Sequence, residues 1–128
     1  MTETLPGWLR WAAERVLPDF QRPTPVALRL RYGMEEDGLE ILWVEEDAGP
    51  GAAGYMLPSG LRGTDLLVWM AGWLQGEVVP ETRAARGEAR PTCPGHPHPL
   101  RAENVDGEAW WTCPLSGQRV TPVGRAVS

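Results

Sequence analysis

Residues 92–117 read TCPGHPHPLRAENVDGEAWWTCPLSG, and this stretch holds both cysteines and both histidines of the 128-residue chain. These four residues are Cys93, His96, His98 and Cys113. Thiolate and imidazole groups are ligands that zinc prefers in proteins. Four ligands scattered at random would share so narrow a window in only about two chains in a hundred. The stretch therefore predicts a metal site that holds one Zn²⁺ per chain.

The same stretch predicts a small β-structure. Two fragments begin with Thr-Cys-Pro, at Thr92 and at Thr112, and each is expected to form a tight turn. Asp106-Gly107, between them, is a strong signal for a two-residue hairpin turn. We expect strands over residues 100–105 and 108–112, and a third strand over residues 118–121.

This order of turn, hairpin, turn and strand resembles a zinc ribbon over residues 92–123. In that family two Cys-Pro-x-Cys knuckles hold one zinc from opposite sides, and N–H groups of the turns stabilise the thiolates. This chain departs from the pattern at Ser116, where the second knuckle would supply its second ligand. We expect His98 to replace it, because residues two apart in an extended segment point to the same side. Pro97 and Pro99 hold that segment extended.

Two other interpretations of the four residues stay open. In the first, Cys93, His96 and Cys113 bind the metal, His98 is free, and water or a substrate takes the fourth position. In the second, the segment is a proline-rich loop that binds no metal and keeps its thiols reduced.

The front of the chain, residues 1–82, predicts an α+β body. Helical spacing of apolar residues indicates helices over residues 6–17, with Thr4 as the N-cap, and 65–79. Alternating residues indicate strands over 26–32, 39–45 and 52–57, which form a meander. In the second strand we expect Leu39, Ile41 and Trp43 to face the core. Gly72 and Gly76 are expected to let the second helix approach the sheet closely.

The predicted fold class is α+β: a small antiparallel meander sheet packed by two helices, followed by a zinc-ribbon-like appendage. Residues 83–91 have no apolar side chain except alanine, so we expect a linker there, with Arg83, Arg86 and Arg90 facing solvent. The metal-binding segment then covers residues 92–128.

Charge and composition exclude several classes of function. The formal net charge is −5, and the chain has 12 arginines but no lysine, which excludes a Walker A loop and a lysine Schiff base. Residues 1–82 carry six arginines and thirteen acids, a formal −7, whereas the rest carries six arginines and four acids, a formal +2. The scarcity of Lys, Ile and Asn suggests a GC-rich bacterial genome. Without a secretory signal or a long apolar stretch, a cytoplasmic protein with no membrane contact is expected.

Three functions fit these observations. We favour a non-enzymatic zinc-binding adaptor whose partner is another protein, because the metal site uses every histidine. A nucleic-acid-binding ribbon is a second possibility, supported by Trp110, Trp111 and the basic back third but opposed by the acidic front. A metallohydrolase with a three-ligand zinc is the third, and it needs Glu103 or Glu108 as its general base. Trp110 and Trp111 are adjacent in a strand, so their rings face opposite sides. We expect one of them to cover the zinc site or to dock the ribbon onto the body, and the other to be exposed.

Overall fold

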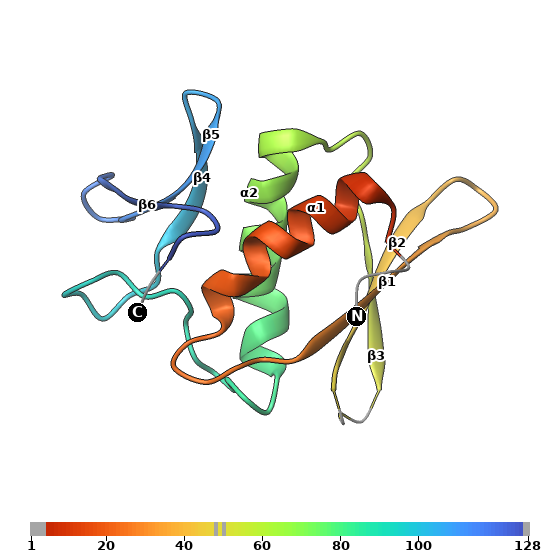
Figure 1. Ribbon diagram of the computed structural model, residues 1–128, viewed down its shortest axis with the longest axis horizontal. Helices are drawn as coiled ribbons and strands as arrows, with labels where there is room; N and C mark the ends of the chain where they lie inside the picture. The colour runs from red at the N-terminus through yellow and green to blue at the C-terminus, as the bar shows by residue number, and fades with distance from the viewer. Residues whose placement is uncertain (1–4, 48, 50, 127–128) are drawn as a thin grey trace.

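A computed structural model describes residues 5–47, 49 and 51–126 of the chain. It has the predicted α+β fold, with two helices and two antiparallel three-stranded sheets. Figure 1 shows the helices between the two sheets. No helix in the described part of the chain is long and apolar enough to cross a membrane. The elements are α1 (Gly7–Val16), η1 (Leu17–Phe20), β1 (Leu28–Met34), β2 (Glu40–Glu46), β3 (Ala52–Met56), α2 (Gly63–Trp73), η2 (Leu74–Val78), η3 (Val79–Glu81), β4 (Arg101–Val105), β5 (Glu108–Thr112) and β6 (Arg119–Pro122).

Helix α1 lies close to its predicted bounds. Its buried stripe consists of Leu9, Ala12, Ala13 and Val16, which recur at the spacing of one helix face. Pro18 follows in η1, where a 3₁₀ turn replaces the α-helix. The predicted N-cap, Thr4, lies outside the described residues.

The first sheet has the predicted meander order β1-β2-β3. The expected core face of its second strand is wrong. Leu42 and Val44 are buried, whereas Ile41 and Trp43 lie half-buried on the outer face. Cross-strand pairing explains this result, because Val44 lies opposite Leu30, which already faces the core.

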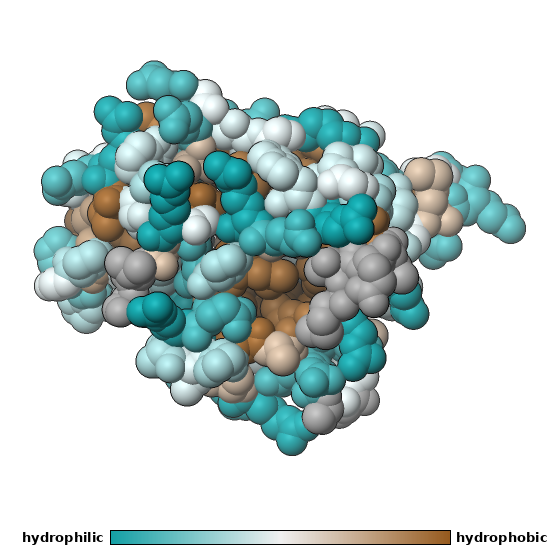
Figure 2. Space-filling model, in the orientation of Figure 1, coloured by the Kyte–Doolittle hydropathy of each residue, from teal (hydrophilic) through white to brown (hydrophobic). Residues whose placement is uncertain are grey.

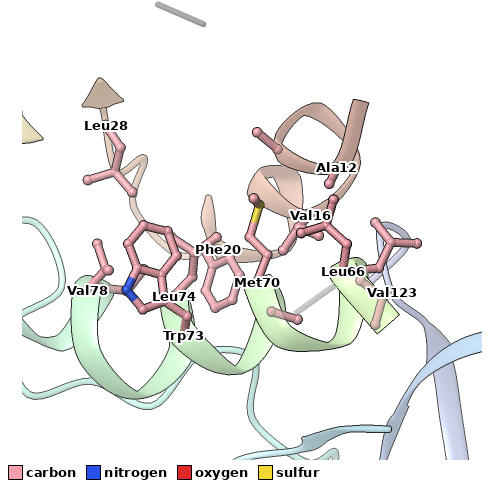
Figure 3. Packing of buried hydrophobic residues seen from close by; sticks show 14 of the residues in the cluster. Ala12, Val16, Phe20, Leu28, Leu66, Met70, Trp73, Leu74, Val78 and Val123 are labelled. Atoms are coloured by element: carbon pink, nitrogen blue, oxygen red, sulfur yellow. The ribbon is translucent and has the colours of Figure 1, made fainter. Parts of the chain in front are cut away.

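Helix α2 is shorter than predicted, because a single π-helical turn, η2, continues it from Leu74 to Val78. Its buried residues pack against α1 and the first sheet in one hydrophobic core (Figure 3). The expectation for its glycines is also wrong: a Cβ placed on Gly72 or Gly76 would meet no heavy atom within 4 Å. Neither glycine marks a close backbone approach.

The second sheet, β4-β5-β6, shares this core. Residues Asp106 and Gly107 adopt positive φ angles of 53° and 87°, as the predicted hairpin turn requires. Trp111 on β5 is completely buried, and its ring meets Phe20 edge to face at 6.0 Å between centroids. Trp111 therefore docks the second sheet onto the helices, and Trp110 is half-buried on the other side of the strand.

Residues 83–91, which join the body to the metal segment, face solvent along only part of their length. Arg83 and Arg86 are exposed, but Arg90 is only 3% exposed, which corrects the expectation that all three arginines face solvent. The Arg90 guanidinium donates hydrogen bonds to the carbonyl oxygens of Phe20 at 2.9 Å and Thr24 at 2.6 Å. This side chain fixes the start of the metal segment against the body.

Candidate metal centre

Two turns with the same backbone hydrogen bond form the centre. The Cys93 N–H donates to the carbonyl of His98 at 2.8 Å, and the Cys113 N–H donates to the carbonyl of Gln118 at 2.9 Å. In each turn the cysteine is thus tied to the residue five positions later. The turns differ inside this bond, because the His96 N–H donates to the Cys93 carbonyl, three positions back, whereas the Gly117 N–H donates to the Cys113 carbonyl, four positions back.

The turns bring the side chains of Cys93, His96, His98 and Cys113 together. One ligand atom from each of them lies within 4.8 Å of the other three. His96 Nδ1 is 3.3 Å from Cys93 Sγ and 4.0 Å from Cys113 Sγ, and His98 Nε2 is 4.0 Å from Cys113 Sγ.

These spacings match the coordination shell of zinc. Zn–S bonds of about 2.3 Å and Zn–N bonds of about 2.0–2.1 Å place tetrahedral ligand atoms roughly 3.3–3.8 Å apart. Three of the sulfur–nitrogen distances lie at 3.3–4.0 Å, and the widest separation in the cluster, within 4.8 Å, is about 1 Å longer than a closed shell needs. An ion at the centre of the cluster would require only small side-chain shifts, so the residues present fit the metal.

The four ligands differ in their exposure to solvent and in the hydrogen bonds that orient their side chains. Cys93 and Cys113 are buried, His98 is half-buried and His96 is exposed. His98 Nδ1 lies 3.2 Å from the carbonyl oxygen of Pro99. A proton on Nδ1 makes this contact a hydrogen bond and leaves Nε2, the atom that faces the cluster, bare for a metal.

Ser116 has a role that sequence reasoning missed. Its hydroxyl and its backbone N–H bond to the Cys113 sulfur and are the largest causes of a pKa lowered to about 6, to which the Leu115 N–H and Cys93 also contribute, although burial works in the opposite direction. Burial raises the pKa of the Cys93 thiol, and the neighbouring Cys113 raises it further. Serine at the position of a missing ligand thus stabilises the thiolate of its own turn. A Ser-Gly pair closing a Thr-Cys-Pro turn was the only sequence signal for this.

The carboxylates considered as general bases do not belong to the cluster. Glu103 lies on β4 and forms a 2.7 Å ion pair with Arg101. Glu108 lies opposite Val105 at the far end of the hairpin, next to the Asp106 turn. The turn that carries Cys113 follows the other end of β5, so the hairpin separates Glu108 from the metal ligands.

A cavity of about 270 Å³ borders the cluster. Its lining includes three of the cluster residues, Cys93, His96 and Cys113, together with Arg119. The Arg119 guanidinium also lies over the ring of Trp110, 5.5 Å from its centroid. The exposed edge of the metal centre is therefore next to a paired arginine and tryptophan.

No family model, no curated protein and no solved structure matches the chain. The resemblance of residues 92–123 to a zinc ribbon therefore stays a prediction. The cluster of ligand atoms is supported by its interatomic distances alone.

Proposed function

We propose that this chain is a non-enzymatic interaction protein of the bacterial cytoplasm, with one structural zinc ion on Cys93, His96, His98 and Cys113. The observation that carries the proposal is the convergence of four ligand atoms within 4.8 Å from two turns. Two thiolates and two imidazoles fill a tetrahedral shell, which is the usual composition of a structural zinc site.

The position of the cluster supports a structural role. One turn precedes β4 and the other joins β5 to β6. Because Arg101 pairs with Thr112, both turns lie at the same end of the second sheet, and an ion held by both would close the open end of the β4–β5 hairpin. The segment before Cys93 is already fixed to the body through Arg90, which bonds to the carbonyls of Phe20 and Thr24. Zinc would thus complete the attachment of a small sheet that buries few side chains of its own.

The remaining chemistry favours binding over catalysis. Both histidines are metal ligands, so neither serves as a general base, and Glu103 is held by Arg101. The partner that we propose is another protein. The net charge of −5 disfavours the polyanionic backbone of DNA or RNA, since binding to phosphates depends on positive charge.

Metal analysis of the purified protein tests the site. We expect about one zinc per chain in the parent protein, and much less in a Cys113→Ser variant. Gln118→Ala, in the same turn but outside the cluster, is the matched control and should keep the full zinc content. Equal zinc in Cys113→Ser and the control would refute the ligand assignment.

Cobalt substitution tests the coordination number. Four-coordinate Co²⁺ with Cys and His ligands should give intense visible absorption, and His98→Ala should change that spectrum by opening a position to water. An unchanged spectrum in His98→Ala would support the three-ligand alternative and would contradict the structural role. His96→Ala provides the comparison for loss of the exposed imidazole.

A nucleic-acid partner is the second candidate, and the Trp110–Arg119 pair beside the metal centre is the observation that favours it. Titration of zinc-loaded protein with short single-stranded DNA and RNA separates the two candidates. We expect no binding at low salt. Measurable affinity that falls steeply with added salt and is lost in Trp110→Ala would replace the protein-partner proposal.

A further inference from the structure

Strand β3 is an open edge of the first sheet. It pairs with β2 on one side only, and Figure 1 shows it at the border of the molecule. Ala52, Ala53 and Gly54 are exposed, and Met56 is 61% exposed. A strand in this position presents a row of backbone donors and acceptors to any chain that can pair with them.

The register identifies which backbone groups face outward. The Leu57 N–H donates to the Glu40 carbonyl at 2.8 Å, and hydrogen-bonded pairs alternate along an antiparallel ladder. Residues 53, 55 and 57 therefore bond to β2, whereas the N–H and C=O groups of residues 52, 54 and 56 point away from the sheet. No backbone hydrogen bond within the described ranges reaches these three residues from outside β2.

The edge also lacks the features that usually protect an edge strand. Natural proteins place charged residues or proline there to prevent pairing between molecules. The outer strand β1 carries Arg29 and Arg31, and β6 in the other sheet carries Arg119. Strand β3 reads Ala-Ala-Gly-Tyr-Met and carries neither a charge nor a proline.

We propose that β3 pairs with β3 of a second copy of this chain, antiparallel, about a two-fold axis at Gly54. In that register Gly54 lies opposite the partner's Gly54, and Ala52 lies opposite the partner's Met56. Each outward N–H and C=O of residues 52, 54 and 56 then has a partner. An axis placed at Ala52 or at Met56 overlaps the strands less and leaves outward groups unpaired, so the backbone favours a single register.

Side chains are complementary in the same register. Ala52 faces the partner's Met56 on the outer surface, and Ala53 faces the partner's Tyr55 on the inner one, so a small residue meets a large one at each position. The Trp43 ring covers Gly54, where an added Cβ would lie 2.7 Å from it. The axis would therefore place the two Trp43 rings on the same outer face of the joined sheet.

The side chains of β3 are uncharged, so pairing brings no like charges of the two β3 strands together. The first sheets of the two copies, each with three strands, would then form one six-stranded sheet. The inference does not depend on the metal centre, which lies in the other sheet, and it holds for metal-free and zinc-loaded protein alike. A short strand contact predicts a reversible dimer whose population rises with protein concentration.

Sedimentation velocity over a concentration series tests the dimer. We expect wild-type protein to change from monomer to dimer below about 1 mM, and Ala52→Lys to weaken dimerisation at least about tenfold, since a lysine on the edge opposes pairing. Ala27→Lys is the matched control. Ala27 is also exposed, at the opposite border of the same sheet, and the substitution adds the same charge. It should dimerise like the wild type.

A second variant tests whether a loss of dimerisation in Ala52→Lys results from misfolding. Ala52→Pro removes only an outward N–H that the monomer does not use, so circular dichroism and thermal unfolding should match the wild type while dimerisation is lost. A wild-type protein that is monomeric at every concentration overturns the proposal. A dimer that is as stable in both Ala52 variants as in Ala27→Lys also overturns the proposal.

Amide exchange measured by NMR gives the register. At high concentration, exchange should slow at Ala52, Gly54 and Met56, whereas Ala53 and Tyr55 should change little because they already bond to β2. A dimer in which these three amides exchange at the monomer rate would form through another surface, and would refute pairing along β3.

Discussion

The indole Nε1 of Trp111 donates a 2.7 Å hydrogen bond to Oδ2 of Asp19, a residue 92 positions earlier in the chain. The same carboxylate accepts from the backbone N–H of Gly124 at 2.6 Å and of Ala126 at 2.9 Å. Asp19 thus joins η1, β5 and the end of the chain at one buried point. Asp19 and Phe20, adjacent in η1, thus both contact Trp111, one through a hydrogen bond and the other through its ring.

Asp19→Asn should destabilise the protein by about 1–3 kcal/mol, the cost of leaving buried donors without an acceptor. An amide keeps one acceptor oxygen but turns its NH₂ group toward N–H donors that the carboxylate satisfied. Urea unfolding followed by tryptophan fluorescence measures the difference. Asp106→Asn, in the exposed hairpin turn, is the control and should unfold like the wild type.

The pH dependence of stability should carry a signature of the same residue. Burial raises the pKa of the Asp19 carboxyl above 3.8, although the hydrogen bonds from Trp111, Gly124 and Ala126 oppose the rise. The folded state then holds this proton more tightly than the unfolded state. The contribution to stability is fully present below pH 3.8 and is lost as the pH rises through the raised pKa.

We therefore expect the stability difference between wild type and Asp19→Asn to be largest in acid and to narrow toward neutral pH. Unfolding curves at a series of pH values would measure it. A gap that widens with increasing pH would mean that the pKa is lowered rather than raised.

Arg90→Met should destabilise the fold by about 2–4 kcal/mol, because it removes a buried cation and leaves its acceptors unpaired. These acceptors include the carbonyls of Phe20 and Thr24 and the carboxylate of Glu88, which lies 2.7 Å from Arg90 Nη2. Thermal unfolding measures the change. The exposed Arg86→Met provides the same substitution as a control, and an equal loss in both variants would contradict the assignment.

Two glycine-to-alanine substitutions should have opposite signs. Gly124 has a φ of 99°, and a Cβ there would lie 2.8 Å from the Arg15 carbonyl oxygen, so Gly124→Ala should lower the free energy of unfolding by about 1–3 kcal/mol. Gly72 lies on the open side of α2 with no atom near its Cβ position. Gly72→Ala should raise the free energy of unfolding by up to about 1 kcal/mol. Urea denaturation of both variants checks the two signs.

Removal of the metal should loosen the second sheet selectively. We expect a chelator to increase hydrogen exchange in residues 92–99 and 113–118, while α1, α2 and the first sheet keep their protection through their own core. Exchange measured by mass spectrometry, with and without chelator, makes the comparison. The Cys113→Ser variant should show the same exchange as the chelated parent protein. An increase in exchange spread evenly over the chain would contradict a metal role confined to the second sheet.

Local signals predicted much of this molecule correctly. The bounds of β5 agree with the sequence prediction because an Asp-Gly turn and a change of composition mark both of its ends. The four cluster residues could be found because a metal site needs rare residue types close together. Both features depend only on neighbours in the sequence.

Features that depend on distant contacts could not be predicted. The orientation of β2 was wrong because both of its faces carry apolar residues, and only pairing with β1 places Val44 inside. The burial of Arg90 depends on acceptors 66 and 70 residues away. The role of Asp19 likewise requires the end of the chain to return to η1. No periodicity within either segment carries this information.

The two turns at Cys93 and Cys113 have one further consequence. The first turn supplies three of the four ligand atoms and the second supplies one, so an ion on the cluster would be shared unequally between them. Loss of Cys113 would release the whole second turn from the ion, whereas loss of one histidine would leave both turns attached. A single thiol thus decides whether the strands that flank the second turn are joined to the rest of the centre.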